Sequence, residues 1–189
     1  MIAAALFAVE LAWWALHRLP PASGGSSPAA SLPPEQAYQR AMALHRAGEF
    51  RAALPFYRRA IDGLPEARYE VHFAHAATLH TLIIAHRTTH GTQVPLTRSS
   101  DEEATLAHEA MAEYQVAARL ATRPEDRARI LLHAGDLYRV WGLAWEAFAA
   151  YREGQALDPT NPALAARGDA LMLLLEHPER NWPGSEPTP

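Results

Sequence analysis

The sequence predicts an all-α protein, built as a short α-solenoid of three helical hairpins with a capping helix at the C-terminal end. Three observations lead to this prediction. Alanine, leucine and arginine dominate the composition and β-branched runs are scarce, which favours helices over strands. Similar segments recur along the chain, as in stacked helical repeats. Prolines and potential capping residues stand where helices are expected to begin and end.

An apolar helix is expected before the solenoid. Residues 2–19 are apolar except for Glu10, His17 and Arg18, and roughly 20 such residues cross a bilayer. We therefore expect residues 1–20 to be a membrane anchor or signal-anchor helix, in a bacterial inner membrane or an organelle membrane. A cleaved signal peptide and an interfacial or partner-buried helix are open alternatives. One arginine beside the segment does not fix the side of the membrane on which the domain lies.

The polar residues of this helix share one face. Glu10, Trp14 and His17 are spaced by four and three residues, and carboxylates facing lipid are rarely tolerated. An intramembrane contact with another subunit is one interpretation, and a tolerated polar residue in a marginal anchor is the other. The residues that follow, 21–33, are rich in Pro, Gly and Ser and are expected to form a flexible linker.

A repeated segment carries most of the information about the fold. AGEFRAALPFYRRAIDGLP begins at Ala47, and WGLAWEAFAAYREGQALDP begins at Trp141. Five residue pairs match at a constant separation of 94 residues: Gly48 and Gly142, Ala53 and Ala147, Tyr57 and Tyr151, Ala60 and Gly154, Pro65 and Pro159. A middle copy contains Ala110, Tyr114 and Ala117. Small residues let paired helices approach closely, the aromatic ring fills the space beside them, and the proline ends the second helix.

This pattern resembles the tetratricopeptide repeat (TPR) family. Leu131, Ala134, Gly135 and Tyr138 also follow the family's W-x₂-L-G-x₂-Y spacing, with leucine in place of tryptophan. The resemblance covers residues 34–176 and implies a protein-interaction domain rather than an enzyme.

Seven helices are expected in this domain, with one longer connection. Their expected ranges are 33–46, 50–63, 67–87, 101–121, 125–140, 144–157 and 162–176. Ser100 with Glu103 and Thr122 with Glu125 have capping-box spacing, and Asn161 precedes Pro162 as an N-cap. The last helix is expected to be a solvating cap. Residues 88–100 form an insertion, interpreted either as a contact loop or as a neutral surface loop, and the proline-rich residues 177–189 are expected to be a disordered tail.

The composition and motifs argue against several kinds of chemistry. A net charge of −4 provides no broad cationic surface for nucleic acid, and the absence of cysteine excludes thiolate sites. Nucleophile-elbow, P-loop and dinucleotide motifs are missing, and His108-Glu109 lacks the second histidine of a zinc protease. We expect no catalytic residues and no cofactor. His72, His75, His86 and His90 share a helical sector with Leu79 and Ile83, which indicates packing; a metal site on this histidine-rich helix is the alternative.

A partner protein is the expected ligand. The TPR resemblance places a concave groove along the first helices of the hairpins, lined by Tyr38, Met42, His45, His72, His75 and Thr78. The chain has no lysine, and its asparagines lie outside the expected groove, which argues against an Hsp70/Hsp90-type carboxylate clamp. The expected function is therefore a membrane-anchored scaffold or assembly factor that binds a partner peptide or helix. The alternative is an accessory subunit of a membrane complex docked through its N-terminal helix.

Overall fold

The structure is a computed structural model that describes residues 29–64, 68–89 and 101–176. These residues form helices joined by short turns and contain no strand, so the all-α prediction is confirmed. The helices are α2 (Pro34–Arg46), α3 (Phe50–Gly63), α4 (Tyr69–Thr89), α5 (Asp101–Leu120), α6 (Pro124–Val140), α7 (Ala144–Leu157) and α8 (Pro162–Glu176). The expected ranges agree with these bounds to within two residues.

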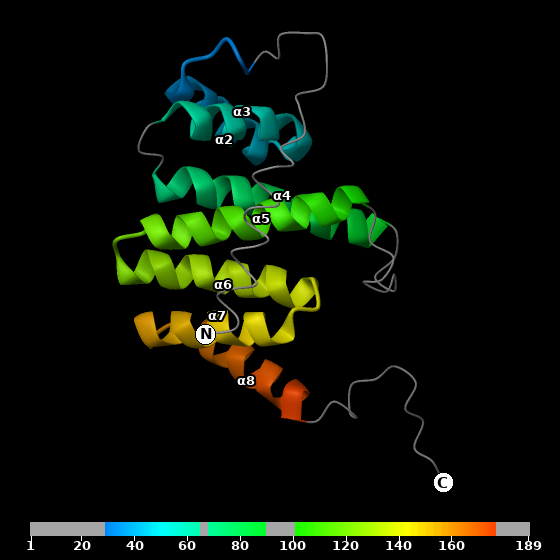
Figure 1. Cartoon of the computed structure of the whole chain (residues 1–189), viewed down its shortest axis with the longest axis vertical. Coiled ribbons are helices and arrows are strands. Elements are labelled where there is room, and N and C mark those ends of the chain that lie inside the picture. The colour runs from blue at the N-terminus through cyan, green and yellow to red at the C-terminus, as the bar shows by residue number, and fades with distance from the viewer. Residues whose placement is uncertain (1–28, 65–67, 90–100, 177–189) are drawn as a thin grey trace, which may run out of the picture.

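The helices follow one another along the long axis of the molecule, from α2 and α3 at one end to α8 at the other (Figure 1). Each packs against its neighbours in sequence, most extensively within the pairs α2–α3, α4–α5 and α6–α7. Helix α4 also contacts α2 and α6. The first helices of the three pairs therefore touch one another along one side of the molecule.

The recurring small and aromatic residues occupy equivalent buried positions in the second helix of each pair. These residues are Ala53, Tyr57 and Ala60 in α3, Ala110, Tyr114 and Ala117 in α5, and Ala147, Tyr151 and Gly154 in α7. Each tyrosine hydroxyl approaches the preceding helix: that of Tyr57 donates to Met42 Sδ at 3.3 Å, that of Tyr151 donates to Asp136 Oδ1 at 2.8 Å, and that of Tyr114 lies 3.5 Å from His80 Nδ1. The tyrosines thus fill the helix interfaces while their polar ends keep a partner.

Two turns explain the recurring glycine. Gly48 and Gly142 have φ of 78° and 80°, a left-handed conformation that glycine adopts without a steric cost. After each, a backbone N–H reaches five residues back: Glu49 donates to Leu44 O and Leu143 to Tyr138 O, both at 2.9 Å. This bond satisfies a carbonyl at the end of the first helix and fixes where the second helix begins.

The start signals are only partly as expected. Asn161 caps α8, since its Oδ1 accepts a hydrogen bond from the N–H of Ala163 at 3.1 Å. The capping box expected at Thr122 is wrong, because the N-cap of α6 is Arg123, which makes no capping bond through its side chain. Proline at the first helical position, Pro124, forces the residue before it into an extended conformation, so the cap falls one residue later than expected. Ser100 lies outside the described residues.

The insertion begins later than expected, because α4 continues through Thr89. Arg87, near the end of α4, bonds Glu103 Oε1 through Nε at 2.5 Å and Val140 O through Nη1 at 2.7 Å. Its guanidinium also lies 5.2 Å from the ring centroid of Trp141. These contacts with α5 and α6 hold the last turn of α4 in place. Residues 90–100 lie outside the description.

Helix α8 is not the solvating cap that was expected. It packs on α7 through Leu164, Gly168 and Leu171, which are buried. Its other side exposes Met172, Leu173 and Leu174 by 36%, 61% and 43%. The outer surface at this end of the stack is therefore apolar.

Candidate functional site

Helix α4 is the most enclosed helix in the described structure and carries the densest group of buried polar side chains. It lies between α3 and α5 and also touches α2 and α6. His72, His75, Leu79 and Ile83 are all buried, which confirms the interpretation of this sector as a packing stripe. The histidines among them must therefore find polar partners on the neighbouring helices.

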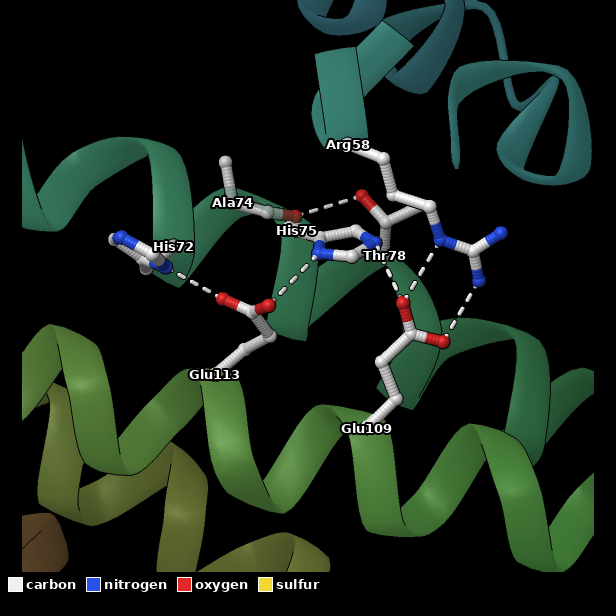
Figure 2. Close-up of polar contacts among 7 residues, drawn as sticks. All are labelled: Arg58, His72, Ala74, His75, Thr78, Glu109 and Glu113. Carbon is white, nitrogen blue, oxygen red and sulfur yellow. Dashed lines mark hydrogen bonds and ion pairs between the residues drawn. The ribbon is translucent and has the colours of Figure 1, made fainter. Parts of the chain in front are cut away.

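Two glutamates of α5 meet the two histidines of α4 (Figure 2). His72 Nδ1 lies 2.5 Å from Glu113 Oε2. His75 lies between both carboxylates, with Nδ1 3.6 Å from Glu113 Oε1 and Nε2 3.6 Å from Glu109 Oε1. These last distances are just beyond hydrogen-bond length, and neither ring nitrogen of His75 has a hydrogen-bond partner within the described structure. The side chains are therefore ordered by charge as well as by hydrogen bonds.

Arg58 extends this group of residues to α3. Its Nε and Nη2 donate to Glu109 Oε1 at 2.9 Å and Oε2 at 2.7 Å. Such a two-bond pairing is both strong and directional. Because the Arg58 side chain is half exposed while that of Glu109 is nearly buried, the guanidinium covers the carboxylate from the solvent side. We name Arg58, His72, His75, Glu109 and Glu113 the α3–α4–α5 network.

The charge of Glu113 is stabilised by its surroundings. Burial alone would raise the pKa of this carboxyl, but hydrogen bonding to His72 and His75 and the positive charge of these imidazoles lower its pKa to about 2. The ionised form is therefore the native one. With its two carboxylates and single guanidinium, the network is a balanced electrostatic joint between consecutive hairpins rather than a solvated charge cluster.

A related contact joins α2 to α4. Thr78 Oγ1 donates its only proton to Ala74 O at 2.7 Å and lies 2.8 Å from His45 Nδ1. His45 must therefore donate through Nδ1, which identifies the tautomer of its ring. Burial lowers the pKa of His45, in agreement with a neutral imidazole at this position.

The network is placed to hold helices together rather than to act on a substrate. His75 is only 1% exposed, so no substrate reaches its ring in this conformation. Across residues 29–64, 68–89 and 101–176, no group of three or more His, Cys, Asp or Glu side chains is positioned to hold a metal ion. His90, part of the predicted histidine sector, lies outside these ranges.

The predicted groove residues separate into two groups. His72, His75 and Thr78 are buried between helices, whereas Tyr38, Met42 and His45 are half-buried on α2. The side of α4 that faces away from α3 and α5 carries Ala77, Thr81 and Ile84, and Ile84 is 44% exposed. These three residues, four and three apart, follow helical spacing opposite the buried stripe, and that spacing is the signal that identifies them.

We name this surface the α2–α4–α6 face. It consists of Ala77, Thr81 and Ile84 of α4, flanked by Tyr38 and Met42 of α2 and by His133 of α6. The flanking helices are in direct contact with α4, as shown by the His45–Thr78 pair and by the rings of Phe73 and His133, whose centroids lie 5.3 Å apart. The face is therefore a continuous, mainly apolar surface formed by three helices.

The predicted intramembrane contact, Glu10, Trp14 and His17, lies outside the described residues. Among the helices that the structure describes, none has the length and apolar character needed to cross a bilayer.

Comparison of the chain with protein-family profiles and with curated proteins finds no match.

Proposed function

We propose that the chain is a TPR-type α-solenoid that binds a partner protein on its α2–α4–α6 face. The observation that carries the proposal is the burial of the same small–aromatic–small residues in α3, α5 and α7, with one glycine turn shared by the first and last hairpins. This agreement between sequence and packing is what a stack of equivalent hairpins requires. A helical stack uses its exposed inner helices as a binding surface.

The partner best suited to this face is an extended segment or helix with apolar side chains. Ala77 and Thr81 are small, so the backbone of a bound segment can approach α4 closely, while Ile84, Met42 and Tyr38 offer apolar contact at the sides. The nearby charged groups are already paired: Asp136 is bonded by Arg167 and Tyr151, and Arg129 by Asp126. Recognition by ion pairs is therefore a minor contribution in this proposal.

The N-terminal residues complete the proposed function. Residues 1–20 would tether the domain to a membrane through the linker, so that the bound partner is a component of a membrane complex. The function would then be that of a scaffold or assembly factor. In the alternative, the chain is a permanent accessory subunit that docks through Glu10, Trp14 and His17. Deletion of residues 1–20 separates the two, because complete loss of association would favour the accessory subunit.

The binding face is tested by Ala77→Arg, which places a long charged side chain in the middle of the α2–α4–α6 face. Ala149→Arg is the matched control, because Ala149 is exposed on the outer side of α7. Both variants are compared with the native chain by crosslinking and proximity labelling in the native membrane. We expect Ala77→Arg to lose partners that Ala149→Arg retains. Equal partner recovery from the two variants, each with a native helical circular dichroism spectrum, would refute the proposed face.

A further inference from the structure

The exposed apolar side of α8 is separate from the binding face proposed above. Residues 29–64, 68–89 and 101–176 contain six large hydrophobic residues that are exposed, and three of them are consecutive in α8: Met172, Leu173 and Leu174. Figure 1 shows α8 at the end of the stack, with no described helix beyond it. A terminal helix of a stack normally has a polar outer side, which keeps the protein soluble.

The outer side of α8 matches the side of α6 that holds α7. Both helices begin with a proline, Pro124 and Pro162. In α6, the positions four and eleven residues later are Ala128 and Gly135, and both lie against α7: a Cβ on Gly154 would come within 3.3 Å of Ala128 O, and one on Gly135 within 2.7 Å of Tyr151 Cδ1. The same positions in α8 are Ala166 and Leu173, and both are exposed. Helix α8 therefore presents a helix-binding side that lacks its helix.

The residues that follow α8 do not have the sequence of a covering helix. Residues 177–189 include four prolines and a single large apolar residue, Trp182. Proline in a helix interior removes a hydrogen bond and clashes with the preceding turn. The missing helix must come from another molecule.

We propose that this partner is a second copy of the chain, and that the α8 helices of two copies pack against each other about a two-fold axis. A two-fold contact uses the same surface on both molecules, so an apolar helix side is complementary to itself. In the described structure, α8 is also the helix with the largest run of exposed apolar side chains available to pair with it. The exposed acids Asp169 and Glu176 flank the apolar residues and disfavour an anionic lipid surface as the occupant.

Analytical ultracentrifugation of the full chain tests this association. We expect a concentration-dependent monomer–dimer equilibrium in the native chain. Leu173→Glu should raise the dissociation constant by more than about a hundredfold, because the symmetry buries two unpaired carboxylates. Leu120→Glu is the matched control, since Leu120 is 44% exposed at the end of α5, and it should leave the equilibrium unchanged. A native chain that is monomeric at every concentration, or a dimer unaffected by Leu173→Glu, overturns the proposal.

Crosslinking locates the contact independently of stability. The chain has no cysteine, so Leu173→Cys provides a single thiol at the proposed two-fold axis. A short thiol-specific bifunctional reagent should convert this variant into a covalent dimer. Trp145→Cys, an equally accessible position on α7 with 64% exposure, should give little dimer. Equal crosslinking of the two variants, or none at position 173, would show that α8 does not form the contact.

Discussion

His72 and Glu113 approach to 2.5 Å between Nδ1 and Oε2, and neither side chain is more than 10% exposed. A charge-assisted bond in such surroundings is short and strong, but removal of one partner leaves the other buried without a counter-charge. The same carboxylate faces His75. Glu113 is therefore the residue on which the contact between α4 and α5 depends most.

Glu113→Gln should lower the free energy of unfolding by about 3 kcal/mol at neutral pH, because it removes the buried charge that the histidines and Arg58 balance. Urea unfolding followed by circular dichroism measures the change. Glu102→Gln is the control on the same helix: Glu102 pairs with Arg51 on the surface, with both side chains more than half exposed, and should matter little. Similar losses in the two variants would contradict the role assigned to Glu113.

The effect of Glu113 should also depend on pH. Its folded-state pKa of about 2 lies below the ordinary value of 4.5. The ionised carboxylate therefore stabilises the fold fully above about pH 4.5, and this contribution is lost as the pH falls toward 2. The difference between the native chain and Glu113→Gln should shrink over that interval. A difference that is constant from pH 7 to pH 3 would argue against the ionised form as the stabilising one.

His80 should make the fold sensitive to a milder acid range. Burial lowers the pKa of His80 from 6.5 to about 4, so the folded state keeps the ring neutral while the unfolded chain takes up a proton below pH 6.5. Stability is then complete above about pH 6.5 and falls as the pH drops toward 4, by about 3 kcal/mol in total. Burial also lowers the pKa of His133, which adds to the same slope.

Urea unfolding at a series of pH values tests this linkage. His80→Gln should flatten the dependence of stability on pH between 6.5 and 4, because glutamine does not titrate. His108→Gln is the control, since His108 is exposed on α5. An unchanged slope in His80→Gln would refute the assignment of the acid sensitivity to this ring.

The sequence predicts the helices well because their ends depend on local residues. Gly48 and Gly142 close the hairpin turns, and Pro162 with Asn161 starts α8, so each boundary is determined within a few positions. The recurring alanine and tyrosine residues likewise define the helix sides that pack together. These features act over one or two turns of helix and are visible without knowledge of the neighbouring helices.

The open side of α4 could not be derived in the same way. This helix is buried on most of its circumference, so apolar, small and histidine residues surround it and no single side stands out by hydrophobicity. The partner of His72 is Glu113, 41 positions away, and nothing in the local sequence connects them. The assignment of His72 and His75 to a groove rested on family resemblance, which places a helix more accurately than the rotation of its side chains.

The cap of α8 should contribute measurably to stability. Asn161→Ala removes the bond to the N–H of Ala163 and should cost about 1 kcal/mol. Arg123→Ala is a matched control, because Arg123 occupies the same position before the first proline of α6 but makes no capping bond through its side chain. Thermal unfolding should separate the two variants by several degrees. Equal melting temperatures would mean that the Asn161 bond has no net value.

Gly135 and Gly168 should respond in opposite ways to alanine. Alanine normally favours a helix interior by about 1 kcal/mol over glycine. At Gly135, however, a Cβ would come within 2.7 Å of Tyr151 Cδ1, and the hydroxyl of that buried ring is already bonded to Asp136. Gly135→Ala should therefore lose about 2 kcal/mol through overpacking. At Gly168 the nearest atoms are 3.7 Å away, so Gly168→Ala should be neutral or stabilising. A more stable Gly135→Ala variant would show that α6 and α7 are not held at this close distance.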